Sequence, residues 1–230
     1  MPVSGVSWQH PSKALIYDGR AWGKPQQVFP TDSSYSGQTI SCVSSRFCVA
    51  VGGEKAATFN GASWSKARAI DHSQVVQAIS CHSATFCAAS DTSGNALTFK
   101  DGKWTAPKLV DRSSHGLTSV ACPSSSQCLA VDYNGNEVTY DGRSWGPQTP
   151  VAVNPGFDSL SCSTPRFCMA VGDAGVALSY NGSTWGKAKS IDSGVQSVSC
   201  PTTRFCAAVD VGDNVMTFNG RSWSRPKTIH

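Results

Sequence analysis

The chain has 230 residues, of which 15% are charged, and its 19 basic and 15 acidic residues give a formal net charge of +4 at pH 7. It contains no basic run that would give a nucleic-acid partner an electrostatic footprint, and no apolar stretch long enough to span a bilayer. Gly, Ser, Thr, Asn and Asp crowd the segments between short apolar runs. This composition is typical of an all-β protein with many tight turns and excludes a coiled coil or a disordered tail.

Two signatures recur along the chain at a period of 38 to 42 residues. The first is Cys-x5-Cys, which pairs Cys42/Cys48, Cys81/Cys87, Cys122/Cys128, Cys162/Cys168 and Cys200/Cys206. The second joins an aromatic residue, a Trp and an Ile or Val, in the sets Tyr17-Trp22-Val28, Phe59-Trp64-Ile70, Phe99-Trp104-Val110, Tyr140-Trp145-Val151, Tyr180-Trp185-Ile191 and Phe218-Trp223-Ile229. A constant interval near 40 residues indicates one supersecondary unit copied in tandem.

Taken in chain order, the copies begin with an incomplete one. Ser4 to Gly19 aligns without gaps on Phe205 to Gly220. It supplies a segment like the second strand of a repeat, ahead of the third and fourth strands. Five complete repeats follow, beginning near residues 39, 78, 119, 159 and 197. We expect a single domain over residues 1–230, with a partial repeat at 4–38.

The last copy illustrates the strands expected in each repeat. Val198 to Cys200 (A), Phe205 to Val209 (B), Val215 to Phe218 (C) and Trp223 to Ile229 (D) are short aromatic or β-branched runs bounded by turn residues. The four-residue A–B link fits a hairpin that sets the two Cys opposite each other.

The C–D link carries Asn-Gly or Asp-Gly in all six copies, which predicts type I′ turns with two residues at positive φ. These dipeptides begin at Asp18, Asn60, Asp101, Asp141, Asn181 and Asn219.

Three hairpins followed by one longer crossing make a four-stranded antiparallel sheet, and such sheets at this period are the mark of a β-propeller. The sequence therefore predicts an all-β propeller. We favour six blades with an incomplete first blade; five blades with an N-terminal extension is the alternative.

Ten Cys in equally spaced pairs favour five disulfides between strands A and B, and so a secreted or extracytoplasmic protein. Five pairs of buried thiols are one alternative. Zinc is another, although its four ligands would have to come from different repeats. No signal peptide precedes Val3, so either Met1 was added to a mature sequence or the protein is cytosolic with reduced cysteines.

Candidate ligand residues lie in the variable B–C and D–A links, which form the face where propellers usually bind ligands. Asp recurs at the fourth position after the second Cys in three repeats. It either caps its own turn or joins a ring of groups that bind glycan hydroxyls. Trp8 has no counterpart in the other copies and suits either packing or ligand contact. The predicted ligand-binding residues are Asp91, Asp132, Tyr133, Asn134, Asp210, Glu54 and Trp8.

The six recurring Trp keep a constant distance from the C–D turn, which favours packing between blades over stacking on sugars. Arg46, Arg166 and Arg204 precede Phe-Cys, and we interpret them as structural residues at the hairpins. No metal-ligand spacing, nucleophile elbow, phosphate loop or dinucleotide fingerprint is present, so we expect no cofactor and no metal.

The tandem Ser-Cys-x5-Cys-x-Ala-Val units with Phe-Asn-Gly-x-x-Trp resemble repeat proteins of secreted actinobacterial-type sequences. The resemblance covers residues 39–230 fully and 4–28 partly, and implies no particular activity. In size and repetition the chain also resembles small propeller lectins such as the tachylectins, a similarity of fold.

The leading hypothesis for function is a monomeric, non-enzymatic binding module for a glycan or polysaccharide, because repeated shallow sites gain avidity on a polymer. A protein-interaction scaffold is the second hypothesis. An enzyme, a hydrolase or lyase with one site on the top face, is the third; its residues would be those that break the repeat. These are Glu54, Glu137, His72, His115, Asp32 and Asp158.

Overall fold

A computed structural model describes residues 12–17, 19–29, 38–72, 74–113, 116–151, 156–172 and 174–229. These residues contain 23 strands in six sheets and no helix, so none of them forms a helix that could cross a membrane. All strand pairs are antiparallel. The predicted all-β propeller of antiparallel blades is confirmed.

The first three sheets, which we call the first, second and third blades, come from the N-terminal half of the chain. The first blade has two described strands, β1 (Lys13–Ala14) and β2 (Gln26–Gln27). The second has β3 (Thr39–Ser44), β4 (Phe47–Gly52), β5 (Lys55–Phe59) and β6 (Arg68–Ala69). The third has β7 (Val76–Ser83), β8 (Phe86–Asp91), β9 (Asn95–Lys100), β10 (Lys103–Trp104) and β11 (Lys108–Leu109).

The fourth, fifth and sixth blades are four-stranded sheets of the same order. The fourth has β12 (Leu117–Ser124), β13 (Gln127–Asp132), β14 (Asn136–Tyr140) and β15 (Thr149–Pro150). The fifth has β16 (Ser159–Thr164), β17 (Phe167–Gly172), β18 (Val176–Tyr180) and β19 (Lys189–Ser190). The sixth has β20 (Val195–Thr202), β21 (Phe205–Asp210), β22 (Asn214–Phe218) and β23 (Lys227–Thr228).

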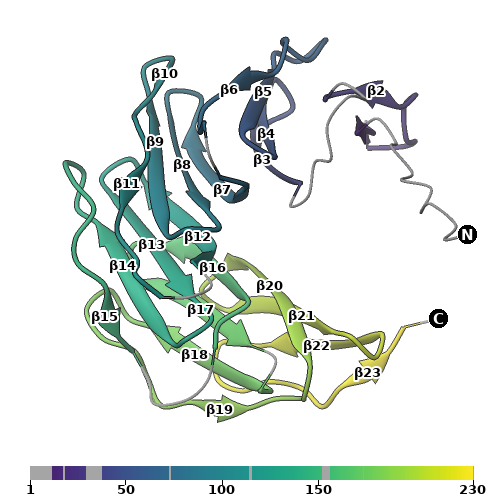
Figure 1. The fold of residues 1–230 in the computed structure, drawn as a ribbon. Coiled ribbons are helices and arrows are strands. Elements are labelled where there is room, and N and C mark those ends of the chain that lie inside the picture. The colour runs from purple at the N-terminus through teal and green to yellow at the C-terminus, as the bar shows by residue number, and fades with distance from the viewer. Residues whose placement is uncertain are drawn as a thin grey trace, which may run out of the picture.

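The blades follow one another around an arc (Figure 1), with the first and sixth at its two ends on either side of an opening. The first strand of each complete blade lies beside that of the next, in the order β3, β7, β12, β16 and β20. Within the described ranges, the arc therefore has two end blades, each with one face that no other described blade covers.

The hydrophobic core lies between blades. Between the fifth and sixth blades, Met169 and Val171 of β17 join one buried cluster with Val198 of β20 and Met216 of β22. Between the second and third, Val49 and Val51 join Ile79 in the same arrangement. The second to fifth blades thus bury the apolar side chains of strand B against the inner strand of the following blade, so burial proceeds from neighbour to neighbour as in other repeat folds.

The serine that precedes the first Cys of a repeat joins its blade to the next. The hydroxyl oxygen of Ser41 accepts a hydrogen bond from the backbone N–H of Cys81 at 2.9 Å. Ser80 and Cys122 are related in the same way at 3.0 Å, and Ser161 and Cys200 at 2.9 Å. In the fourth blade Ala121 takes this place, and the Ser119 hydroxyl accepts instead from the Leu160 N–H at 3.1 Å.

The C–D turns differ from the prediction of type I′ geometry. Among the described turns, only Asp101-Gly102 has both residues at positive φ (50° and 85°). In four others the prediction is wrong, because the chain makes a four-residue loop in which only the Gly has positive φ. In the loop 60–63, for example, the Asn60 side-chain oxygen accepts hydrogen bonds from the N–H groups of Ala62 and Ser63. The side chain caps the loop and makes a second positive φ unnecessary.

All ten Cys form the five predicted disulfides within blades, each joining the first two strands of one sheet. The bridges link Cys42 with Cys48, Cys81 with Cys87, Cys122 with Cys128, Cys162 with Cys168 and Cys200 with Cys206. The two alternatives, paired free thiols and a zinc site, are wrong because every Cys sulfur is bonded to another sulfur. Disulfides persist in oxidising compartments, so these bridges suggest such an environment.

The second Cys of a bridge is also part of the core. In four repeats this residue is fully buried, and it belongs to an apolar cluster that two neighbouring blades share. The four residues are Cys87, Cys128, Cys168 and Cys206. The bridges therefore stabilise the contact between blades and lie away from the links where we expected ligands to bind.

We expect titration of the unfolded, unreduced protein to find close to zero free thiols. Replacing both Cys162 and Cys168 by Ala should lower the free energy of unfolding by about 2 kcal/mol, because the short loop that the bridge closes in the unfolded chain is released. Denaturant unfolding of the variant and of the reduced wild type measures the effect. A titre near ten thiols would contradict the disulfides.

Candidate interaction surface

The three recurring Asp are used by their own B–C turns. Asp132 is fully buried, and its Oδ1 accepts hydrogen bonds from the backbone N–H groups of Asn134 at 2.9 Å and Asn136 at 2.7 Å. Its Oδ2 accepts from the Asn136 side-chain amide at 2.6 Å and from the Gln148 amide at 3.1 Å. Each carboxylate oxygen therefore already has two donors within the turn and its surroundings.

Asp91 and Asp210 make the same turn, with Asn95 and Asn214 in the place of Asn136. The sequence signal for it is Asp-x3-Asn, which recurs in these three repeats. The remaining predicted ligand residues are placed differently. Tyr133 and Asn134 are exposed at the tip of the Asp132 turn, and Glu54 is exposed in the second blade. Trp8 lies outside the described residues.

The recurring Asp has a raised pKa in the third blade and a lowered pKa in the sixth. Burial raises the pKa of the Asp91 carboxyl, and a hydrogen bond to the Asp71 carboxyl adds to this rise against the donors from Asn95 and Ser93. The pKa of Asp210 is lowered, chiefly by the Asn214 side chain and backbone N–H. The difference arises because Asp91 is enclosed between blades, whereas Asp210 is on the end blade.

Five of the six recurring Trp pack between blades, as their constant spacing predicts, and Trp22 of the first blade is the exception. The indole N–H of Trp185, in the fifth blade, donates to Glu137 Oε2 of the fourth blade at 2.8 Å. Trp145 likewise donates to Thr98 Oγ1 of the third blade at 3.3 Å. Glu137, a candidate acid for the enzyme hypothesis, thus serves as an acceptor between blades.

No three His, Cys, Asp or Glu side chains within the described ranges are arranged to hold a metal ion. The arginines that precede Phe-Cys lie over the C–D turns: a Cβ on Gly61 would be 3.1 Å from the Arg46 Cγ, and one on Gly182 would be 3.0 Å from the Arg166 Cγ.

The largest departure from the sequence interpretation is an apolar surface on the sixth blade. We call it the open face and define it by Phe205, Ala207 and Val209 of β21 with Val215 of β22. Phe205 is 46% exposed and Val209 is 40% exposed. In the fifth blade the equivalent strand positions are held by Phe167, Met169, Val171 and Ala177, which the sixth blade covers. The open face keeps the composition of a buried interface.

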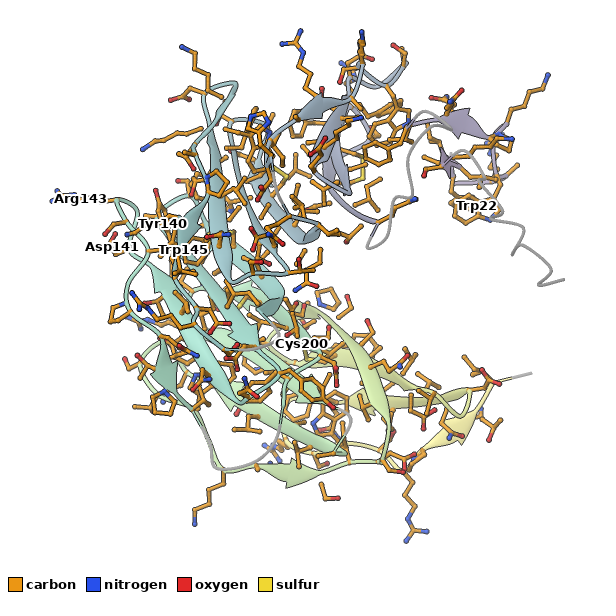
Figure 2. All side chains as sticks on the ribbon, in the orientation of Figure 1. Trp22, Tyr140, Asp141, Arg143, Trp145 and Cys200 are labelled. Atoms are coloured by element: carbon orange, nitrogen blue, oxygen red, sulfur yellow. A yellow bond between two sulfur atoms is a disulfide. The ribbon has the colours of Figure 1, made fainter. Side chains whose placement is uncertain are left out.

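At the other end of the arc, the first blade exposes the face that, in the fourth blade, packs against the preceding blade. Tyr17 and Trp22 form a tilted pair with ring centroids 5.3 Å apart, and Trp22 is 67% exposed. Figure 2 shows Trp22 on the first blade at the end of the arc, and the equivalent pair Tyr140 and Trp145 at the outer rim of the fourth blade. That second pair has a similar centroid distance, 5.4 Å, but is buried against the third blade.

No protein-family model matches this sequence, and no curated protein matches it. Among solved structures, the WD40 β-propeller domain of Doa1 is similar with a TM-score of 0.73 and 11% identity, over 97% of this chain and 78% of that one. A chain from the structure of YCF48 bound to D1 peptide has a TM-score of 0.66 and 15% identity, over 90% and 71%. U3-55K has a TM-score of 0.63 and 9% identity, over 77% and 61%. At these identities the similarity shows the propeller fold alone.

Replacing Glu137 by Leu should lower the free energy of unfolding by about 1–3 kcal/mol, because the Trp185 indole N–H then loses its acceptor. Glu137→Gln is the matched control, since its amide oxygen still accepts, and it should lose less. Chemical denaturation of the three proteins measures this. Equal losses in both variants would contradict the role of this hydrogen bond.

Stability should depend on pH through Asp91. Because its folded pKa is raised, its contribution to stability is fully present below its ordinary value of 3.8 and is lost as the pH rises through the folded pKa. The thermal stability of Asp91→Asn relative to wild type, measured over a series of pH values, should therefore rise as the pH is raised above 3.8.

Asp210→Asn is the control in the equivalent slot. Its pKa is lowered, so its contribution is present above 3.8 and is lost as the pH falls through the folded pKa. The stability of this variant relative to wild type should therefore improve on acidification. If the stability of both variants relative to wild type changed with pH in the same direction, the opposite pKa shifts of Asp91 and Asp210 would be contradicted.

Proposed function

We propose that the protein is a non-enzymatic binding propeller that recognises another protein through the open face of the sixth blade. The observation that supports this is the exposure of Phe205 and Val209. In each of the second to fifth blades, the equivalent positions are covered by the following blade. Contiguous apolar surface of this kind is uncommon on soluble proteins and marks sites of association.

The chemistry of the partner follows from the interface that the open face resembles. In the fifth blade, Met169 and Val171 pack on Val198, Met216 and Phe218 of the sixth. A partner for the open face should therefore present a small, flat, aliphatic and aromatic surface such as one side of a β-hairpin or a short sheet. Burial of apolar area supplies the affinity, at about 25 cal/mol per Å² before the losses of association.

The comparisons support a propeller scaffold of this general kind. YCF48, which is similar in fold, was solved bound to D1 peptide. A propeller that binds a peptide is a precedent for the architecture, and the residues that carry the contact in this chain are argued from its own open face.

Carbohydrate binding is the second candidate, and the exposed Tyr17–Trp22 pair favours it. Two aromatic rings that are uncovered on one surface form a platform on which a sugar ring can stack, because their faces are apolar and rigid. Tyr133 and Asn134, exposed beside the capped Asp132 turn, would be the hydrogen-bonding residues of the repeated-site version of this proposal, with Asp91, Asp132 and Asp210 holding the turns. We place either activity outside the cell, in keeping with the five disulfides.

The test uses a photo-crosslinking residue at position 209, with one at position 171, buried between blades, as the matched control. The two crosslinking proteins and the variants Val209→Asp and Trp22→Ala are each incubated with proteins and glycans secreted by the organism that produces this protein. Thr203→Asp, in the exposed A–B turn of the sixth blade, controls for added charge.

We expect position 209 to crosslink a defined protein whose binding Val209→Asp lowers at least tenfold, with Thr203→Asp unchanged. Crosslinks from position 209 to residues 15–22 of the same chain would mean that the ring closes on itself and would overturn the proposal. Binding to glycans alone, lost in Trp22→Ala and retained in Val209→Asp, would replace it with the carbohydrate function.

A further inference from the structure

Two cavities lie along the boundary between the third and fourth blades. One, of about 420 Å³, has Lys100 of β9, Lys108 of β11 and Arg143 of the fourth C–D loop among its lining residues. The other, of about 490 Å³, is lined in part by Lys108, Arg112 and Trp145. Because the two cavities share Lys108 and Trp145, they lie side by side. We call them together the basic groove.

The basic groove presents positive charge to solvent. Its Lys and Arg side chains are all exposed, and no described residue that lines either cavity is Asp or Glu. Figure 2 shows one of these cations, Arg143, projecting outward beyond Tyr140 and Trp145. The acid next to it in the chain, Asp141, caps its own loop: its Oδ1 accepts hydrogen bonds from the backbone N–H groups of Arg143 at 2.8 Å and Ser144 at 2.7 Å. The groove therefore carries more positive than negative charge.

Hydrogen bonds across the blade boundary hold the groove in shape. The Nζ of Lys108 donates to the carbonyl oxygen of Trp145 at 3.1 Å. An ammonium group has three donors, so two are left for a ligand. The backbone N–H of Arg112 donates to Gln148 Oε1 at 3.3 Å, and the amide of Gln148 donates in turn to the buried Asp132 at 3.1 Å. These contacts position the two walls of the groove before a ligand binds, which reduces the cost of ordering them.

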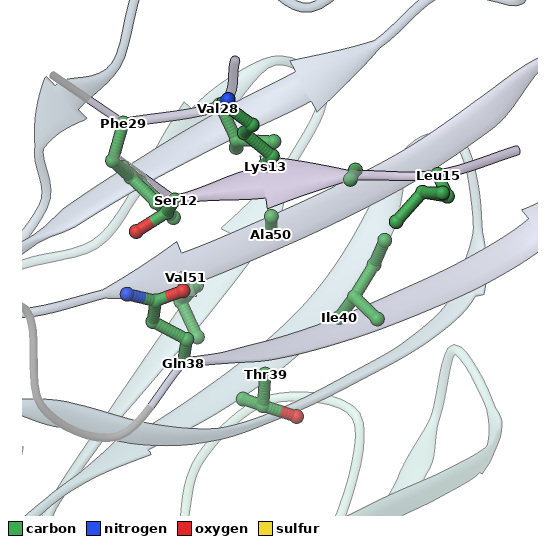
Figure 3. Close-up of a pocket in the computed structure, with 11 residues that line it drawn as sticks. Ser12, Lys13, Leu15, Val28, Phe29, Gln38, Thr39, Ile40, Ala50 and Val51 are labelled. Atoms are coloured by element: carbon green, nitrogen blue, oxygen red, sulfur yellow. The ribbon is translucent and has the colours of Figure 1, made fainter. Parts of the chain in front are cut away.

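The boundary between the second and third blades has a similar cavity. Its volume is about 410 Å³, its lining includes Lys66 and Arg68, and again no described lining residue is Asp or Glu. Arg68 of β6 has the position of Lys108 in the repeat. The pocket between the first and second blades is different (Figure 3): it has about 240 Å³, is mostly apolar, and Lys13 is the only cation among its described lining residues. Two basic cavities thus lie at successive blade boundaries, on either side of the third blade.

We propose that the basic groove binds a linear anionic polysaccharide, whose carboxylate or sulfate groups pair with Lys100, Lys108 and Arg143. Ammonium and guanidinium groups form strong charge-assisted hydrogen bonds with such anions. A polymer with an acid group in each repeating unit can extend from this groove to the cavity at Lys66 and Arg68, so that several weak contacts gain avidity. The site is separate from the open face of the sixth blade and requires no protein partner.

The lining of the groove favours a sugar chain over a nucleic acid or a membrane. Proteins that bind single-stranded nucleic acid stack its bases on aromatic rings, but Tyr140 and Trp145 are only 5% and 6% exposed. The exposed residues beside the cations include Thr105 and Ser144, whose hydroxyls can bond those of a sugar. The outer edge of the arc is convex (Figure 1), so a flat bilayer would contact only a few blades.

The experiment measures binding of the full-length protein to three polymers by isothermal titration calorimetry. Polygalacturonate carries carboxylates, dextran sulfate carries sulfates, and unmodified dextran is the neutral control. We expect binding to at least one charged polymer and none to dextran, and the charged polymer that binds more tightly identifies the acid group. Raising the NaCl concentration from about 0.05 M to about 0.5 M should weaken binding at least tenfold, because salt screens exposed charges.

Substitutions in the groove test where the polymer binds. The triple variant Lys100→Gln, Lys108→Gln and Arg143→Gln should weaken binding at least tenfold, because three ion pairs are lost together. Thermal unfolding checks that the variant folds, and exposed substitutions of this kind change stability little. If the triple variant does not fold, Lys100→Gln with Arg143→Gln takes its place, since it keeps the hydrogen bond of Lys108, and it should weaken binding at least threefold.

A matched control removes the same charge elsewhere. Lys187→Gln, Arg225→Gln and Lys227→Gln alter exposed side chains of the fifth and sixth blades and together should change the affinity less than about twofold. Equal losses in the two triple variants would overturn the proposal. So would a lack of binding to both charged polymers, or tighter binding to DNA or to phosphatidylglycerol vesicles than to either. Val209→Asp, on the open face, should bind the polymers like wild type, so a failure of the proposed function would leave this test intact.

Discussion

The structure depends on the contact between strand B of one blade and the inner strand of the next. A single four-stranded sheet of this size leaves both of its faces uncovered, and the buried clusters of this chain all draw their residues from two neighbouring blades. The serine hydroxyls of Ser41, Ser80 and Ser161 add a hydrogen bond to the following inner strand at the same contact. Stability is consequently a property of pairs of blades, and each blade is ordered by its neighbours.

An interface that repeats must also end, and the ends are where this molecule differs from blade to blade. Phe205 and Val209 at one end, and Tyr17 and Trp22 at the other, are the same kinds of residue that lie buried in the middle of the arc. Asp91 and Asp210 show the electrostatic counterpart, since one turn gives a raised pKa inside the arc and a lowered pKa at its end. Position along the arc, as well as the local sequence, determines what a residue does.

This explains how much could be predicted from the sequence. The repeat period, the strand order and the pairing of Cys42 with Cys48 and its counterparts follow from spacing within one repeat, and they were predictable. The type I′ turns were wrong because the Asn60 side chain caps a longer loop. The contact of Glu137 with Trp185 joins residues 48 apart, in different slots of adjacent repeats. A comparison of equivalent positions between repeats could not reveal this contact. The Asp-x3-Asn turn, in contrast, has a spacing within one repeat and was visible in the sequence.

The ends of the arc also bear on how the protein can bind. Repetition favours several weak, equivalent sites, as a multivalent lectin requires. The exposed apolar surface is not repeated: within the described residues the open face occurs once, because the following blade covers the same positions in the second to fifth blades. A surface that exists in one copy must bind with one-to-one stoichiometry and must supply its affinity from a single contact. The buried-interface composition of Phe205, Ala207, Val209 and Val215 is suited to this, since apolar area gives more affinity per contact than hydrogen bonds exposed to water. The repeats thus build the scaffold, and the place where they stop provides the distinctive surface.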